Sequence, residues 1–579
     1  MKKSHLALLA ASTLALALPA MRPALADGVS GPYLAGRVAS INSDYRAAAD
    51  YFTRALVADP SNTALMESAL LAEVGVGEMD KARAIAAALD QTGQKNGLAD
   101  LVTLLGLAKD GKFPEAIAAL DKGRSAGLLV DGLFRAWAEV GAGQMSEATK
   151  AFDSVAKEKG LGPFALYHKA LALASVGDFE GADAILSDQG IGAQVSSRRS
   201  LVAHAEVLSQ LERDKDALAL LDKVAGPAPD DKVLADLRKR LAAGETVPFS
   251  LIRSPADGLA EVFLAVGSVL AQNPGGDGQD RGSPVDVLMF ARAAVYLRPD
   301  LSEAQLMLAG NLESQGQHDL AIAVYNQIDA AGPDHIAAEL GRADAMIAAG
   351  QPDAATAVLQ DLAKAEPKRA DVWASLGDVE RRNQRFAEAQ QAYSQSLALI
   401  GEPSTNQWVL FYARGICFER LKEWDKAEPD FRKALALSPD QPAVLNYLGY
   451  SFLEHKTNLD EAVAMIQKAA KAEPDDGAIA DSLGWALYRT GKFADAEKQM
   501  EKAIALMPDD PVVNDHLGDV YWMVGRKLEA QFQWKRALSF KPDSEEDAKR
   551  IRRKLEVGLD AVLKDEGAPA SAAAPNDNG

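Results

Sequence analysis

One stretch of the sequence has the residue order of a catalytic serine. Residues Gly123–Gly127 read Gly-Arg-Ser-Ala-Gly and fit the pattern G-x-S-x-G, a sharp turn that exposes a serine nucleophile after a buried strand. The residues before it follow helical spacing instead, so no strand is expected to present the serine. We interpret the string as a Gly-rich loop between two helical segments. The sequence therefore predicts no catalytic residue and no enzyme.

Residues that can bind a metal ion are present but are not spaced as ligands. The histidines after residue 26 include no H-E-x-x-H motif and no pair at ligand spacing: His168, His204, His318, His335, His455 and His516. The acidic loop Asp277–Asp280 lacks the closing Glu of a calcium-binding loop. Cys417 stands between Ile416 and Phe418 and indicates a buried apolar side chain. No phosphate-binding glycine motif occurs, so we expect no metal and no cofactor.

A repeat of about 34 residues organises most of the chain. Its second half has a small residue, a bulky residue four later, Ala three after that and Pro five further on, as in "ADAEKQMEKAIALMPDD" (494–510). Its first half, as in "LGWALYRTGKF" (483–493), has small and apolar residues at helical spacing and ends in a turn. The first small residue of the second half recurs at Ala48, Ala82, Ala116, Ala148, Ala182, Ala217, Val287, Ala321, Ala355, Ala389, Ala427, Ala462, Ala496 and Ala530.

Each unit is therefore a helix, a tight turn and a second helix, and the proline ends the second helix. Small residues at fixed positions let two helices approach to about 8–10 Å, and stacked pairs bury an apolar face that one pair exposes. This pattern resembles the tetratricopeptide repeat (TPR), most closely over residues 300–543 and more weakly over 62–230. The resemblance implies an all-α, right-handed superhelical α-solenoid of about 14 helix-turn-helix units.

Two interruptions divide the repeat. The spacing between Ala217 and Val287 is twice the usual one, and a four-residue insertion lies near Glu402–Gln407. The predicted organisation is a signal peptide (1–26), a degenerate N-terminal array (27–230), an irregular helix and long loop that form a possible hinge (231–284), a C-terminal array (285–543), a capping helix (544–567) and a disordered tail (568–579).

In TPR proteins the first helix of each unit lines a concave groove, and positions around its packing glycine face that groove. Carried onto the units around Gly449, Gly484 and Gly518, this resemblance implies eleven partner-binding candidates: Asn446, Tyr447, Tyr450, Asp481, Trp485, Tyr488, Arg489, Asp515, His516, Asp519 and Trp522. Aromatic residues make up only 6% of the chain, yet five of these candidates are aromatic, as binding hot spots often are. The alternative is that some of them pack between helices as core.

The N-terminus has the features of a cleaved export signal. Lys2 and Lys3 precede an apolar run, and the small-residue site Ala24–Ala26 follows it. Three of the 62 basic residues lie in this segment, so cleavage leaves 59 basic against 82 acidic side chains, a net charge of −23. Such a charge disfavours nucleic acid and anionic lipid. We expect an exported, periplasmic protein with no direct membrane anchor; its oligomeric state stays open.

The function expected from these features is a non-catalytic scaffold that binds a partner protein or peptide of the cell envelope in its groove. Residues 445–497 resemble part of envelope TPR lipoproteins that act as adaptors for carboxyl-terminal-processing proteases, although this chain lacks their lipid-anchor cysteine. The alternative is an assembly factor for outer-membrane or polysaccharide-export machinery.

Overall fold

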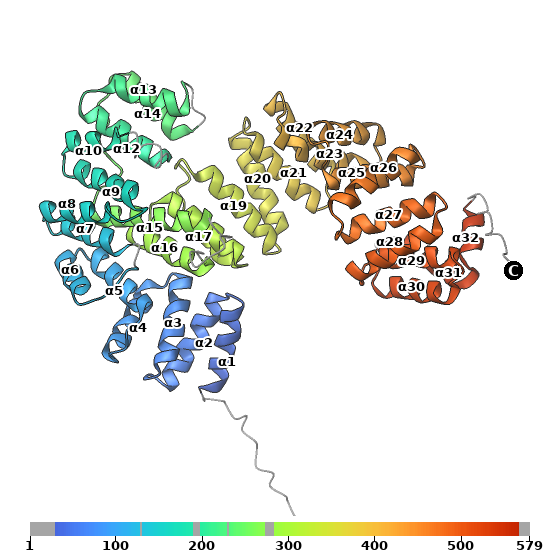
Figure 1. Cartoon of the computed structure of the whole chain (residues 1–579), viewed down its shortest axis with the longest axis horizontal. Helices are drawn as coiled ribbons and strands as arrows, with labels where there is room; N and C mark the ends of the chain where they lie inside the picture. Colours follow the sequence, from blue (N-terminus) through green and yellow to red (C-terminus); the bar gives the residue numbers. More distant parts are fainter. Residues whose placement is uncertain are drawn as a thin grey trace, which may run out of the picture. The chain divides into compact units, whose positions relative to one another are not determined.

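The computed structural model of this chain describes residues 29–127, 130–188, 197–227, 231–272, 283–542 and 544–566 (Figure 1). These residues form α-helices and one 3-10 turn, with no strand among them, so the all-α prediction is confirmed. The chain divides into two compact units, residues 1–351 and 352–579, here called unit 1 and unit 2. The predicted signal peptide, the Asp277–Asp280 loop and the predicted tail (568–579) lie outside the described residues.

Unit 1 consists of consecutive helices that pack mainly on their neighbours in the chain (Figure 1). They are α1 (Ser30–Ile41), α2 (Tyr45–Ala58), α3 (Thr63–Val76), α4 (Met79–Gln91), α5 (Gly97–Lys109), α6 (Phe113–Asp121), α7 (Asp131–Gly141), α8 (Met145–Val155), α9 (Gly162–Ser175), α10 (Phe179–Leu186), α12 (Arg198–Gln210), α13 (Asp214–Ala225), α14 (Lys232–Ala242), α15 (Pro255–Gln272), α16 (Pro284–Leu297), α17 (Ser302–Ser314), α18 (His318–Tyr325) and α19 (His335–Ala348).

Unit 2 has the same construction. Its helices are α20 (Pro352–Ala365), α21 (Ala370–Arg382), α22 (Phe386–Ile400), the 3-10 turn η1 (Thr405–Gln407), α23 (Trp408–Arg420), α24 (Trp424–Leu437), α25 (Pro442–His455), α26 (Leu459–Ala472), α27 (Gly477–Arg489), α28 (Phe493–Leu506), α29 (Pro511–Met523), α30 (Lys527–Ser539), α31 (Glu545–Val557) and α32 (Leu559–Asp565). We call the first helix of each repeat its A helix and the second its B helix.

The residues at the helix ends are those that the repeat predicts: a proline after one helix and a capping residue before the next. At the boundary between two repeats, α28 ends at Leu506, Pro508 follows, and Pro511 is the first residue of α29. The Asp510 carboxylate accepts hydrogen bonds from the N–H groups of Val512 and Val513, at 2.8 and 3.0 Å. A proline cannot continue a helix and an aspartate can cap the next one, so each Pro-Asp boundary turns the chain into a new repeat.

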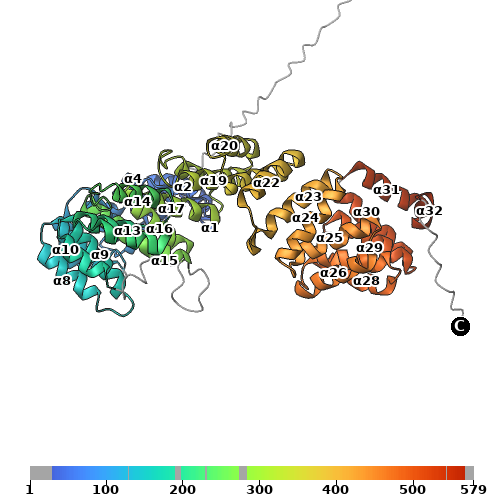
Figure 2. The same ribbon diagram turned by 90° about the horizontal axis from the view of Figure 1, so that it is seen from above.

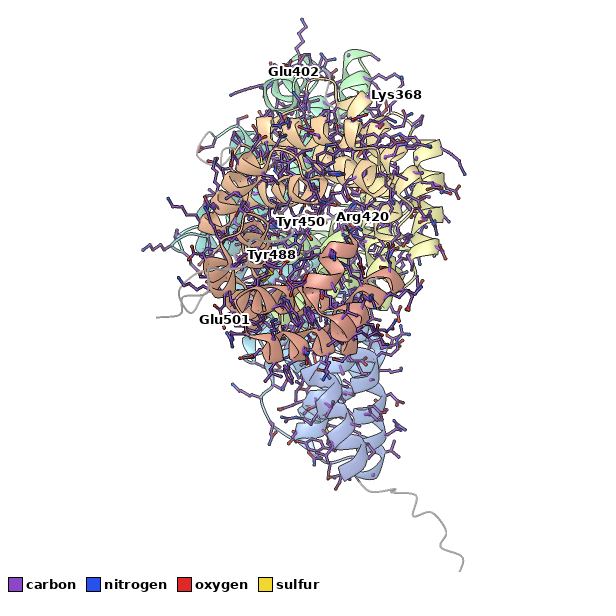
Figure 3. All side chains as sticks on the ribbon, turned by 90° about the vertical axis from the view of Figure 1, so that its right-hand side faces the viewer. Lys368, Glu402, Arg420, Tyr450, Tyr488 and Glu501 are labelled. Atoms are coloured by element: carbon purple, nitrogen blue, oxygen red, sulfur yellow. The ribbon has the colours of Figure 1, made fainter. Side chains whose placement is uncertain are left out.

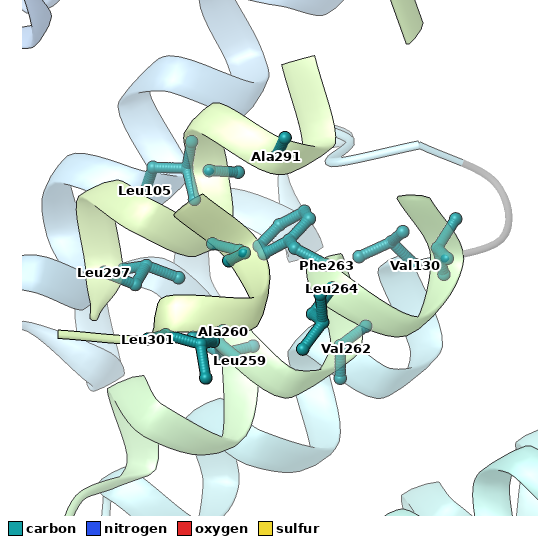
Figure 4. Close-up of a cluster of buried hydrophobic side chains, with 14 of the residues drawn as sticks. Leu105, Val130, Leu259, Ala260, Val262, Phe263, Leu264, Ala291, Leu297 and Leu301 are labelled. Carbon is teal, nitrogen blue, oxygen red and sulfur yellow. The ribbon is translucent and has the colours of Figure 1, made fainter. Parts of the chain in front are cut away.

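In unit 1, two later helices fill the face that the earlier A helices share. Helix α16 packs against α3 and α5, and α15 packs against α7 and α9, although some 90 to 230 residues of sequence separate the partners. Figures 1 and 2 show α15 and α16 among these earlier helices, and Figure 4 shows the apolar side chains between them. This face of unit 1 is therefore part of the core.

The contacts of α15 are close and aromatic. Gly258 lies where α15 crosses α7, since a Cβ there would be 2.4 Å from the ring of Trp137. Phe263 is fully buried, with ring centroids 6.5 Å from Phe134 of α7 and 6.0 Å from Phe290 of α16. The first contact requires a residue without a side chain, and the second fills the space between three helices.

A half-buried and a buried arginine connect the same helices to their neighbours. Arg199 of α12 donates its Nε–H to Glu261 of α15 at 3.0 Å. Arg292 of α16 donates to the carbonyls of Gly75 and Val76, at 2.7 and 3.0 Å, and so satisfies the last turn of α3. Burial alone would make these charges costly, so their pairing with a carboxylate and with helix-end carbonyls is what makes the arrangement tolerable.

The segment 231–284 lies inside unit 1. Helix α14 packs on α12 and α13, and α15 pairs with α16 across the long connection between them. The two compact units meet in sequence between α19 and α20, helices that the 34-residue spacing assigns to one repeat. A hinge within 231–284 stays a prediction.

Candidate interaction surface

Three A helices of unit 2 carry the eleven candidate residues, here called the candidate surface. They are α25, α27 and α29, and each packs on its own B helix beside a glycine. A Cβ on Gly449 would lie 2.8 Å from Ile466, one on Gly484 2.8 Å from Met500, and one on Gly518 2.4 Å from Trp534. These distances confirm that the repeated glycine serves the close approach of the two helices.

The residue after the second glycine, Trp485, lies in an aromatic stack. Its ring is 4.0 Å from that of His516 with an angle of 11° between the planes, and 4.7 Å from that of Tyr488 with an angle of 9°. Its indole Nε1–H donates to Glu454 at 3.0 Å. Trp485 is only 8% exposed, so it joins two adjacent A helices and offers little surface of its own.

Carboxylates on one A helix pair with basic side chains 35 residues later on the next. Glu454 lies 3.5 Å from Arg489, Asp481 accepts from His516 at 3.0 Å, and Asp519 accepts from Lys554 at 2.6 Å. We call these three contacts the ladder. The common offset of 35 residues arises because one repeat separates the partners, which brings residues of similar position together across adjacent A helices.

The last step of the ladder is deeply buried. Lys554 of α31 is 1% exposed, Asp519 is 1% exposed, and Lys554 also donates to Asp515 at 2.8 Å. Trp534 donates its Nε1–H to Asp519 at 2.9 Å. Burial raises the pKa of Asp519, and the ammonium of Lys554 opposes this shift. Helix α31 therefore does more than cover the end of the stack, because it supplies the counter-ion of two candidate carboxylates.

The candidates on α25 are more accessible. Tyr447 donates its hydroxyl to Glu419 at 3.2 Å, and its ring packs edge-on against Tyr412. Burial raises the pKa of Tyr450 and keeps its phenol protonated. Tyr450 and Tyr488 are labelled in Figure 3. The Oδ1 atom of Asn446 is buried without a hydrogen-bond partner.

The structure thus divides the candidate surface into two groups. Asp481, Trp485, Tyr488, His516 and Asp519 are buried and hold the A helices together. The half-buried members are Asn446, Tyr447, Tyr450, Arg489, Asp515 and Trp522. Sequence reasoning did not single out Glu454, Arg550 and Lys554, although the 35-residue offset between acids and bases was present in the sequence as a signal.

The other residues with possible chemistry are structural. Ser125 donates its hydroxyl to Asp131 at 2.7 Å and accepts from the N–H of Gly127 at 3.0 Å, so it orders the turn before α7. Cys417 is fully buried, and burial raises the pKa of its thiol to about 12. Among the described residues, no group of three His, Cys, Asp or Glu side chains is placed to hold a metal ion. None of the helices described is both long and apolar enough to cross a membrane.

We expect the stability of unit 2 to fall as pH rises from 6 to 9 through the His516–Asp481 pair. Burial disfavours the imidazolium, but the carboxylates of Asp481, Asp515 and Asp519 raise the pKa of His516 above its ordinary value. The pair therefore stabilises the fold fully below pH about 6.5, and its contribution is lost as pH rises through the raised pKa. Each tenfold gain in the proton affinity of His516 on folding adds about 1.4 kcal/mol to that contribution.

Urea denaturation of the wild type and of His516→Gln at pH 6, 7, 8 and 9 measures this effect. Tryptophan fluorescence reports mainly unit 2, because six of the seven tryptophans follow residue 351. The stability gap between the two proteins should narrow as pH rises. A gap that is constant or widens contradicts the assignment.

Comparisons with known proteins agree with this geometry. Models of the tetratricopeptide repeat match residues 33–97, 312–379, 408–441 and 456–511. These segments are tetratricopeptide repeats, and proteins built from them generally mediate protein–protein interactions.

Two curated relatives carry the same repeat. A TPR repeat-containing protein of Pseudomonas aeruginosa is 34% identical over 192 residues, which are 32% of this chain and 31% of that protein. Human tetratricopeptide repeat protein 13 is 28% identical over 192 residues, 32% of this chain and 22% of that protein. The match therefore spans less than a third of either relative.

Two solved structures show some likeness to this chain. A chain of the APC/C hetero-tetramer Cut9–Hcn1 is 14% identical, with 92% of this chain and 96% of that chain covered and a TM-score of 0.38. A tetratricopeptide repeat protein of Parabacteroides merdae is 17% identical, with 44% and 98% covered and a TM-score of 0.36. The fold assignment rests on the helix pairs described above.

Proposed function

We propose that this chain is a non-catalytic, periplasmic interaction scaffold and that unit 2 binds a segment of a partner protein on the candidate surface. The observation that carries the proposal is the half-buried set of aromatic and polar side chains on the three successive A helices α25, α27 and α29. Large aromatic side chains supply contact area at little entropic cost, and tyrosine, tryptophan and arginine dominate binding hot spots.

The filled face of unit 1 supports placing the partner on unit 2. The equivalent A-helix face of α3, α5, α7 and α9 is already packed by α15 and α16. In contrast, the main packing partners of α21, α23 and α25 within the described residues are helices adjacent in the stack. A partner that uses the A-helix face finds it open on those helices of unit 2.

A more specific role follows from two features of the sequence. The resemblance of residues 445–497 to envelope protease adaptors supports an adaptor that brings a carboxyl-terminal-processing protease to its substrate. The predicted signal peptide supports a periplasmic location, where such proteases act. With no lipid-anchor cysteine, the adaptor would act as a soluble protein or through a membrane-bound partner.

Photo-crosslinking tests both the interaction scaffold and the more specific adaptor role. A photoreactive phenylalanine analogue in place of Tyr450 is expected to crosslink the partner in native cells, and mass spectrometry of the adduct should identify a carboxyl-terminal-processing protease. The control carries the analogue at Lys498, an exposed position on the B helix α28. Adducts with another protein at position 450 alone would reject the adaptor role and keep the scaffold. Identical results at both positions would reject the surface.

A further inference from the structure

The last helix of the described chain lies against one end of the candidate surface. Asp560 of α32 accepts a hydrogen bond from the indole Nε1–H of Trp522 at 3.0 Å. Leu559 is fully buried and belongs to the same apolar cluster as Trp485, Tyr488 and Leu517, and Val562 is 4% exposed. A seven-residue helix is unstable alone, so these contacts hold α32 in place.

Acidic residues of α32 and its end also reach the basic residues of α31. Glu566 accepts from the Nε–H of Arg550 at 2.7 Å, and Asp565 lies 3.6 Å from Arg553. The guanidinium of Arg550 is in turn 3.9 Å from Asp515 and 3.8 Å from Asp519. Glu566 thus neutralises a cation that also faces two carboxylates of the candidate surface.

A single glycine connects α32 to the rest of unit 2. Gly558 has φ +83° and ψ 159°, a conformation that residues with a side chain rarely adopt. A Cβ at this position would lie 2.6 Å from the ring of Trp522. The chain therefore turns sharply at Gly558, directly against Trp522, and folds α32 back toward Arg550.

We propose that α32 is an internal occupant of the candidate surface and that it shows the chemistry of the external partner. That partner segment is a short amphipathic helix with two apolar side chains three residues apart and carboxylates that accept from Trp522 and Arg550. Its binding displaces α32 about Gly558. The inference rests on the proposed function, because it assumes that the partner uses this same surface, and it adds both the partner's chemistry and a competitor within the chain.

A peptide of residues 558–566 added in trans tests the occupancy. The full chain with Leu559→Asp and Val562→Asp should release its own α32 and bind the labelled peptide at least tenfold more tightly than wild type, by fluorescence anisotropy. The charge-matched control is Val57→Asp with Val224→Asp, two exposed valines of unit 1 that are expected to leave binding at the wild-type level. Adding Trp522→Ala to the released variant should abolish the gain.

A second variant keeps the apolar contacts in case the first one unfolds. Asp560→Ala with Glu566→Ala removes the polar contacts to Trp522 and Arg550 and keeps the apolar ones, and it should raise peptide affinity by a smaller factor than the first variant. Both variants are compared with wild type only if circular dichroism shows that they keep the wild-type helical content. If such a folded variant binds the peptide no more tightly than wild type does, the proposal is wrong. Absence of binding to both folded variants also overturns it.

The crosslinking experiment separates this proposal from the function on which it rests. If position 450 captures its partner equally well in wild type and in the released variant, α32 is no competitor while the interaction surface stands. If the peptide binds as expected but position 450 captures no protein, the proposed function fails while the internal contact stands. Stronger capture by the released variant supports both.

Discussion

Replacing Lys554 by methionine is expected to lower the free energy of unfolding of unit 2 by about 3–5 kcal/mol. The ammonium of Lys554 is the buried counter-ion of Asp519 and Asp515, at 2.6 and 2.8 Å. Methionine fills a similar volume but removes the cation that hydrogen-bonds to both carboxylates, and Arg550, at 3.8 to 3.9 Å, replaces it only in part. Urea denaturation followed by tryptophan fluorescence measures the loss.

Two further variants test the cause of that loss. Lys535→Met removes an exposed lysine from α30 and should change stability by less than about 0.5 kcal/mol. Lys554→Met combined with Asp519→Asn should recover part of the loss, because it removes one of the two carboxylates that lose their hydrogen bond to Lys554. A Lys554→Met protein within about 1 kcal/mol of wild type would mean that solvent already screens these carboxylates.

Replacing Phe263 by alanine is expected to cost unit 1 about 3–5 kcal/mol. Its ring is fully buried between α15, α7 and α16, so the change opens a cavity where three helices meet. Native-state hydrogen exchange should show protection falling together in α5, α7 and α15, because one shared core holds them.

The matched control is Phe532→Ala in α30. Phe532 is 60% exposed, so the same chemical change there should cost less than about 0.5 kcal/mol. If α5 and α7 keep their protection in Phe263→Ala while only α15 loses it, the early repeats are stable without the helices that cover them. That result would contradict a shared core in unit 1.

The helix pairs were predictable because their causes are local. A glycine such as Gly484, a small residue such as Ala496 and a proline such as Pro508 act within one repeat of about 34 residues. The packing of α15 on α7 was not predictable in this way, because it joins residues more than a hundred positions apart. A partial signal existed in α5, where Leu101, Val102, Leu104 and Leu105 are apolar on more than one helical face.

The sequence predicted in part how the candidate residues lie together, and their binding of a partner stays a prediction. The positions around Gly484 and Gly518 do bring Trp485, Tyr488 and His516 together, as their place in the repeat implies. Their burial could not be inferred from a single repeat, because a large side chain at such a position packs against the A helix of the next repeat. Lys554 was hidden for a different reason: it occupies an apolar position of α31, and only its offset of 35 residues from Asp519 indicates the pair.

The filling of unit 1 by its own later helices also governs how the chain can fold. In an open array each repeat contacts only its neighbours, so folding can spread from any point and stability adds up repeat by repeat. Here α3 and α5 lack their covering helix until α16 has been synthesised, about 190 to 220 residues later. Such contacts raise the contact order and slow folding. The nascent N-terminal repeats therefore expose apolar surface during synthesis. A chaperone that binds apolar segments can bind these repeats for longer than later ones, because their covering helix is synthesised so much later.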